Sequence, residues 1–181
     1  MSKLSVYRES DGATPISVTE SFDEIVTILA AVGIRLERWE ADRELTDDAD
    51  NDTIIAAYQS EIDRLVSERG YQSFDVVSMN ASHPDKDAFR MKFLDEHTHG
   101  EDEVRFFVHG HGLLVMHVED RVYSMLCEKN DLISVPANTR HWFDMGPNPN
   151  FTAIRLFNNP DGWIAQFTGD EIAKRFPLLD N

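Results

Sequence analysis

Two stretches in the first half of the chain repeat apolar residues at helical spacing. Between residues 21 and 33 the apolar positions share one helical face, and they are Ile25, Ile28, Leu29 and Val32. Ser21 and Glu24 have the spacing of a capping box at the start of this segment, and Gly33 is a typical residue just beyond a helix end. The pattern therefore predicts an amphipathic helix here.

A second helix is predicted from Thr53 to Arg69. The apolar residues of this segment again recur three or four positions apart, and they are Ile54, Tyr58, Ile62, Leu65 and Val66. The acidic run before it, 47–52, predicts a solvated turn or the start of that helix. A short helix ending near Leu94 is predicted to follow the loop at His83. Strands are predicted in this half at residues 3–8, 34–41 and 74–79.

The second half has a different pattern, with short β-type runs separated by Gly, Asn, Asp and Pro. These runs are residues 104–112, 113–120, 121–130, 131–136 and 152–157. Closely spaced short strands without alternating helices favour a sandwich or barrel. We expect an α+β fold in one domain, 1–181, with a helical elaboration over about 20–95 and a β-barrel core over about 96–160.

Composition and charge exclude several classes of protein. The 181 residues carry a formal net charge of −16, and a surface of that sign repels nucleic acid and anionic membranes. No apolar run is long enough to span a bilayer, and the first residues lack the pattern of a signal peptide. Cys127 is the one cysteine, so no intrachain disulfide can form, and we expect it to be a small buried hydrophobe. The expectation is a cytoplasmic monomer that binds neither nucleic acid nor membrane.

The stretch "DEHTHGEDEVRFF" contains the first half of a candidate metal site. His97 and His99 lie two residues apart, so in an extended chain they point to the same side, with Cα atoms roughly 6.6 Å apart. Glu103 shares their parity and can reach the same point once the chain turns at Gly100. The pattern predicts two imidazoles and one carboxylate on one side of the start of a strand.

The second half of the candidate site lies in "NDLISVPANTRHWF". Pro136 and Asn138 predict a turn, because Asn tolerates the left-handed conformation, and His141 begins the next strand. A neighbouring strand that starts there can bring His141 beside the other three side chains. Three histidines and a carboxylate suit Fe, Ni, Mn, Co or Zn and leave coordination positions open in a six-coordinate metal.

These motifs resemble those of the cupin superfamily. In that superfamily the first motif ends in H-x-H, three or four residues, E, six residues and G, as His97, His99, Glu103 and Gly110 do here. The second motif keeps Pro136 and His141. The sequence departs from the cupin pattern at positions that hold no ligand, and they are Met91, Asn130, Asn138 and Met145. The resemblance implies a cupin-type β-barrel, a double-stranded β-helix or jelly roll.

The segments "HTHGEDEVRFFVHGHG", "LISVPANTRHWFDMG" and "IRLF" are similar to bacterial acireductone dioxygenases, and this similarity extends over nearly the whole chain. It implies that His97, His99, Glu103 and His141 hold one Fe(II) or Ni(II) per chain. It also implies a methionine-salvage enzyme that oxidises 1,2-dihydroxy-3-oxo-5-methylthiopentene with O2. The family's products are 4-methylthio-2-oxobutanoate and formate with Fe(II), and 3-methylthiopropanoate, formate and CO with Ni(II).

Candidate substrate-binding residues each have a structural alternative. Arg105 shares the parity of Glu103, so it either contacts an anionic substrate, as the resemblance implies, or forms an internal salt bridge, for which Glu103 itself is a candidate partner. Arg155 either serves similarly or occupies a surface strand position. Phe93, Phe143 and Trp163 either wall an apolar pocket for a thioether tail or simply pack in the core.

Other polar residues near the motifs have simpler interpretations. His109 and His111 form a second H-x-H pair, but the glycines around them favour a hairpin turn or a surface position. Glu101 and Asp102 are interpreted as solvated turn residues, with Glu101 as a possible substitute ligand. His117 is interpreted as a structural histidine. The functional alternatives are another metal-dependent cupin oxygenase or isomerase, or a non-catalytic small-molecule-binding cupin.

Overall fold

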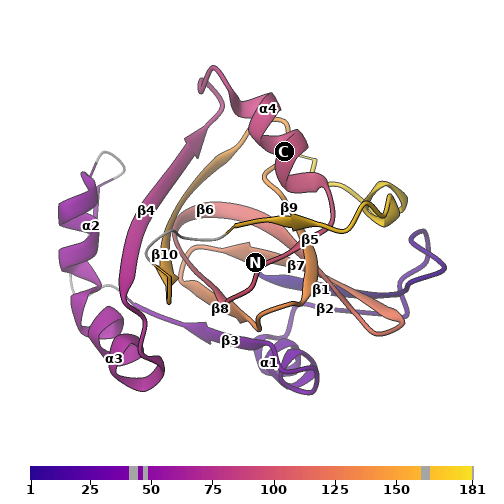
Figure 1. Cartoon of the computed structure of the whole chain (residues 1–181), viewed down its shortest axis with the longest axis horizontal. Coiled ribbons are helices and arrows are strands. Elements are labelled where there is room, and N and C mark those ends of the chain that lie inside the picture. The colour runs from indigo at the N-terminus through magenta and orange to yellow at the C-terminus, as the bar shows by residue number, and fades with distance from the viewer. Residues whose placement is uncertain (41–44, 47–48, 160–163, 181) are drawn as a thin grey trace.

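Two antiparallel sheets pack against each other and share one long strand (Figure 1). The computed structural model describes the whole chain except residues 41–44, 47–48, 160–163 and 181. The first sheet has the order β11 (Gln166–Phe167), β5 (His97–Thr98), β9 (Arg140–Asp144), β6 (Glu103–Val118), β7 (Arg121–Glu128), β1 (Lys3–Arg8), β2 (Ser17–Thr19). The second has the order β4 (Ser73–Asn80), β10 (Asn150–Phe157), β6, β8 (Asp131–Val135), β3 (Arg35–Arg38). The predicted α+β class is confirmed.

Strand β6 belongs to both sheets because it bends halfway along. Its first half pairs with β10 and β8, and its second half pairs with β7 and β9. Phe107 pairs with Ala153 and His109 with Thr152, so Val108 is an extra residue in a β-bulge. The bulge changes which residues face the core, from odd-numbered before it to even-numbered after it. The predicted break into two strands at a hairpin turn around Gly110 was therefore wrong.

Gly110 is required where β6 bends. Its φ is +69°, and a Cβ atom added there would lie 1.7 Å from the backbone oxygen of Asn150. We expect Gly110→Ala to lower the free energy of unfolding by more than about 3 kcal/mol, because the backbone of β10 would have to shift. Gly70→Ala is the matched control: φ is +73°, but no atom lies within 4 Å, so we expect a loss of about 1 kcal/mol. Urea unfolding of both variants tests this, and equal losses would contradict it.

The main core lies between the two sheets. Ile25 and Leu29 of α1 (Phe22–Ala30) pack into this core, as predicted. The predicted capping box was wrong, since the Ser21 side chain makes no cap hydrogen bond. Instead, the Thr19 hydroxyl donates to the Glu24 carboxylate and accepts the N–H of Ser21. A side chain before the helix is therefore still bonded to its first turn, but that side chain belongs to Thr19 and not to Ser21.

The predicted helix from Thr53 to Arg69 is two helices, α2 (Asn51–Ala57) and α3 (Gln59–Arg69). Asp50 caps α2 by accepting the N–H of Thr53, so the described end of the acidic run, 50–52, is the start of a helix, while residues 47 and 48 lie outside the described residues. The break falls at Tyr58, which is buried against the ring of Phe106 at a centroid distance of 4.7 Å. Both helices cover the outer face of the second sheet beside β4 (Figure 1).

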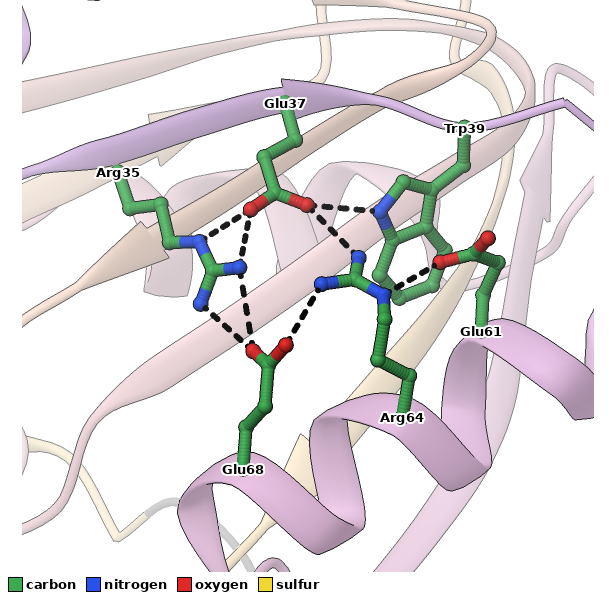
Figure 2. A network of polar contacts seen from close by, with 6 residues as sticks. All are labelled: Arg35, Glu37, Trp39, Glu61, Arg64 and Glu68. Carbon is green, nitrogen blue, oxygen red and sulfur yellow. Dashed lines mark hydrogen bonds and ion pairs between the residues drawn. The ribbon is translucent and has the colours of Figure 1, made fainter.

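Charged residues also join α3 to β3 (Figure 2). Glu37 accepts hydrogen bonds from Arg35, from Arg64 at 3.0 Å and from the indole of Trp39 at 3.0 Å. Partial burial would raise the pKa of Glu37, but these donors outweigh it and lower the pKa. Because the network is partly exposed, it adds only modestly to stability and mainly fixes where α3 lies.

The remaining elements lie near the first sheet. The helix predicted after His83 is α4 (Lys86–Leu94), which contacts β9. A 3-10 helix, η1 (Ile172–Arg175), was not predicted. It packs on the outer face of the first sheet against Trp142. None of the described helices is long and apolar enough to cross a membrane.

Candidate metal centre

Three histidines and a glutamate converge where β5, β6 and β9 meet. His97 lies on β5 and pairs directly with His141 on β9, while His99 follows β5 and Glu103 begins β6. The backbone oxygen of His99 accepts the N–H of Asn138, which holds the turn before β9 beside it. One ring nitrogen from each histidine lies within 4.8 Å of the others, and all three side chains are buried.

Backbone carbonyl groups orient all three imidazoles in the same way. The Nδ1 atoms lie 2.7 Å from the oxygen of Asp95 for His97, 3.2 Å from that of Ile164 for His99, and 2.8 Å from that of Thr139 for His141. A carbonyl oxygen only accepts, so each Nδ1 carries a proton, and in the neutral ring each Nε2 is left with a lone pair. This is the tautomer in which imidazole binds a metal through Nε2.

Glu103 places a negative charge among these lone pairs. Its Oε2 atom lies 3.1 Å from Nε2 of His99 and 2.9 Å from Nε2 of His141. Burial would raise the pKa of Glu103, but the guanidinium of Arg105 and the contacts with His141 and His99 hold it well below its usual value, so it is a carboxylate. The Nε2 atom of His141 is buried and makes no hydrogen bond among the described residues.

This combination fits a divalent cation. Lone pairs and a carboxylate that converge in a buried site repel one another unless a positive charge lies between them. Burial and the nearby His141 lower the pKa of His97 to about 4, so that ring is neutral at physiological pH, as a ligand must be. The donors are three nitrogens and one oxygen, which suit Fe, Ni, Co, Mn or Zn.

A cavity of about 140 Å³ opens beside these residues. Its apolar wall includes Phe93 and Phe143, which also pack against the main core, together with Val77, Phe151 and Phe167. Phe151 lies on the same face of β10 as Arg155, four residues away, so strand alternation could have identified it. Phe167 belongs to the short edge strand β11, which the sequence did not predict. Trp163 lies outside the described residues.

Three cations also line the cavity: Lys92, Arg105 and Arg155. Arg105 donates to Oε1 of Glu103 at 2.9 Å and lies over the ring of Phe143, 4.2 Å from its centroid. The predicted inward orientation is confirmed, and the predicted internal salt bridge is present. Burial lowers the pKa of Arg105, but a guanidinium starts so high that it stays a cation.

Arg155 pairs with Arg105 across β10 and β6, so both side chains leave the same face. Two hydrogen bonds of 2.9 and 2.6 Å connect Arg155 to Asp75. Arg155 is partly exposed and also lines the cavity, so the structure is compatible with both interpretations of this residue. Lys92, at the exposed rim on α4, was not predicted, because only the packing of α4 beside β9 brings it there.

The other polar residues of the motifs lie outside this cluster. Glu101 and Asp102 are not merely solvated: Glu101 accepts the N–H groups of Asn158 and Asn159, and Asp102 accepts that of Ala137. Glu101 therefore fixes the end of β10. It does not substitute for Glu103 in the cluster.

The second H-x-H pair, His109 and His111, lies beyond the bulge of β6, within the strand and not in a turn. His109 lines a separate cavity of about 640 Å³ on the outer side of β10, which contains none of the converging residues. His117 is buried and bonded to Glu96, as a structural histidine would be. Cys127 is fully buried in the core, where burial raises its pKa well above the usual value.

Comparisons with known proteins identify what the chain is similar to. The sequence model of the ARD/ARD' family matches residues 3–165. "Acireductone dioxygenase" of Pseudomonas aeruginosa strain UCBPP-PA14 is 60% identical over 181 residues, which is 100% of both chains. That of Klebsiella pneumoniae is 59% identical over 179 residues, covering 99% of each. The solved structure "Acireductone dioxygenase from Bacillus anthracis with cadmium ion in active center" has a TM-score of 0.80 and 30% identity, and the match covers 92% of this chain and 98% of that one.

Proposed function

The chain belongs to the ARD/ARD' family, and we propose from this membership that it is a metal-dependent dioxygenase that oxidises an acireductone with O2. The substrate is 1,2-dihydroxy-3-oxo-5-methylthiopentene, and the reaction is a step of methionine salvage. The structural likeness to an acireductone dioxygenase agrees with a cupin-type fold. The observation that carries the proposal is the convergence of three buried imidazoles and one carboxylate at a cavity lined by cations.

The proposed ligands are His97, His99, Glu103 and His141, which would hold one Fe(II) or Ni(II) per chain. The oriented Nε2 atoms and the carboxylate of Glu103 support this set, and the related Bacillus anthracis structure holds a cadmium ion in its active center. When bound, the metal supplies a Lewis acid and a template on which the substrate's oxygens are held. All four proposed ligands come from this chain.

The other residues bind and orient the substrate. Arg105 would place its positive charge beside the anionic acireductone in a buried site, where such a contact is strongest. Its hydrogen bond to Glu103 and its position over Phe143 hold the guanidinium in one orientation before substrate arrives. Arg155 would add to the positive potential of the cavity. Its hydrogen bond to Asp75 would keep the guanidinium from contacting the substrate directly.

Phe93 and Phe143, with Phe151, would pack against the methylthio tail and exclude water from it. A single chain supplies every proposed residue, so we propose a monomer whose partners are the small molecule and O2. With a net charge of −16 it would bind neither nucleic acid nor membrane, and it would act in the cytoplasm.

The choice of metal is proposed to decide the products. Metal-free protein is reconstituted separately with Fe(II) and with Ni(II), and the products are identified by mass spectrometry and gas analysis. We expect 4-methylthio-2-oxobutanoate and formate from the Fe(II) form. The Ni(II) form should give 3-methylthiopropanoate, formate and CO. The same products from both forms would contradict this part of the proposal.

Lys92 leads to a prediction about how substrate reaches the cavity. The chain repels anions as a whole, and this exposed cation lies at the rim of the cavity. We expect Lys92→Gln to lower kcat/KM about 10-fold at low salt with kcat unchanged, and the difference to shrink as ionic strength rises. Lys3→Gln, a cation on β1, removes the same charge elsewhere and should have no such effect. Equal salt dependence in both variants would contradict the prediction.

A further inference from the structure

Helix α4 forms one wall of the proposed substrate cavity but has little buried apolar surface to hold it there. It contributes Phe93 to the apolar wall and Lys92 to the rim. None of its residues is fully buried: Phe93 and Leu94 pack only partly against the core, and Met91 is 72% exposed. Helices of globular proteins are usually fixed by a buried apolar face. Polar contacts must therefore take a larger part in fixing α4 beside β9 (Figure 1).

Arg90 makes such a polar contact from the same face of α4 as Phe93, three residues further along. Its Nε atom donates to Oδ1 of Asp144 at 2.7 Å, and its Nη2 atom donates to Oδ2 at 3.0 Å. Asp144 ends β9 directly after Phe143, and its side chain is only 1% exposed. Two parallel hydrogen bonds between a guanidinium and a carboxylate fix both distance and direction. The pair therefore joins the helix that carries Phe93 to the strand that carries Phe143.

The backbone around Asp144 fixes its carboxylate as well. Oδ1 also accepts the N–H of Gly146 at 2.9 Å, and Oδ2 accepts the N–H of Leu179 at 2.9 Å. The Nη2 atom of Arg90 donates in addition to the carbonyl oxygen of Leu179 at 3.3 Å. The carboxylate therefore cannot turn away from Arg90 without breaking its bonds to the backbone.

The tail of the proposed substrate would sense even a small displacement of α4. Attraction between apolar groups falls by roughly a quarter to a half when a gap of about 0.5–1 Å opens between them. Phe93 reaches the cavity from α4, whereas Arg105 and the proposed ligand Glu103 lie on β6. Movement of α4 would thus weaken the contact with the methylthio group and leave the binding of the substrate's oxygens unchanged.

We propose that Arg90 and Asp144 are positioning residues of the substrate cavity, and that their contact holds Phe93 where it selects acireductones with a methylthio tail. This inference rests on the proposed function. The alternative is that the pair stabilises the fold only, as other buried ion pairs do. Stabilisation of the fold changes the amount of active enzyme but does not depend on which tail the substrate carries.

Steady-state kinetics of the Fe(II)-loaded protein test the inference with two substrates, 1,2-dihydroxy-3-oxo-5-methylthiopentene and the same acireductone without the methylthio group. We expect Arg90→Met to raise KM about 10-fold for the first substrate, as the loss of a small apolar contact in a pocket does, with kcat within about twofold. KM for the second substrate should stay unchanged. Arg90→Lys keeps the charge but not the planar fork, so it should show a smaller rise.

Arg38→Met is the matched control. The Nε atom of Arg38 lies 3.3 Å from the fully buried carboxyl group of Asp131, and Arg38 is not among the residues that line the cavity. This variant takes the same charge away from a buried carboxyl group and should leave KM for both substrates unchanged. In Arg90→Met, α4 keeps a second attachment, because Lys86 donates to the carbonyl oxygen of Pro147 at 2.6 Å.

An unchanged KM in Arg90→Met, or an equal rise for both substrates, would overturn the inference and leave the proposed function standing. A wild type that oxidises neither acireductone would instead overturn the proposed function and this inference with it. Should Arg90→Met not fold, Arg90→Lys decides the question by itself. A rise in KM confined to the methylthio substrate supports the inference there, and an unchanged value overturns it.

Discussion

Replacement of His99 by alanine is expected to remove the metal from the purified protein. His99 is buried, its Nε2 atom lies 3.1 Å from Glu103, and the only other described imidazoles that line this cavity are the proposed ligands His97 and His141. We expect metal affinity to fall by more than about 100-fold, beyond the usual cost of disturbing an outer partner. Metal content per chain after dialysis, measured by mass spectrometry, tests this.

His109→Ala is the matched control, because His109 lies on the outer side of β6 beyond the bulge. This variant should keep one metal per chain. The opposite result, with metal retained in His99→Ala and lost in His109→Ala, would place the site at the second H-x-H pair.

Replacement of Arg105 by alanine is expected to separate metal binding from turnover. Arg105 contacts Glu103 through Oε1, while the atom that faces the histidines is Oε2. Metal content should therefore stay near one per chain. We expect kcat/KM to fall at least about 100-fold, because truncating a buried charged partner costs about 2–5 kcal/mol.

Arg105→Lys distinguishes charge from geometry. A lysine keeps the positive charge but not the planar fork that can contact Glu103 and a substrate oxygen together, so partial recovery is expected. Steady-state kinetics on both metal-loaded variants provides the measurement. If Arg105→Ala is fully active, Arg105 has only the structural role of its salt bridge, and the argument from substrate charge is wrong.

Sequence patterns correctly predicted features that depend only on residues close together in the chain. Parity predicted that Arg105 faces inward with Glu103, and it does, because no bulge lies between them. Asn138 was expected to take the left-handed conformation of a motif glycine, and its φ is +63°. His97 and His141 are brought together by register between two strands far apart in sequence. The turn before His141 allowed that pairing, and the motif resemblance implied it.

Features that depend on packing could not be predicted from one sequence. Glycine permits both turns and bulges, so the glycines around His111 did not show whether the chain forms a hairpin turn or a bulged strand. In the structure the strand continues and bends at a bulge, in which Val108 is the extra residue. The helix breaks at Tyr58, whose ring packs on Phe106, and no proline or glycine marks that position in the sequence. Glu96 and His117 are 21 residues apart and meet only after β5 joins the sheet.

The central claim is that this cluster holds a metal that lets the chain oxidise an acireductone with O2. The most direct measurement follows the loss of the acireductone's ultraviolet absorbance together with O2 uptake, using metal-free protein and the same protein with Fe(II) added back. We predict no catalysis without metal and rapid, O2-dependent loss after Fe(II) is added. Tight metal binding with no turnover above the uncatalysed oxidation would contradict the claim and would indicate a cupin that acts on another substrate or only binds one.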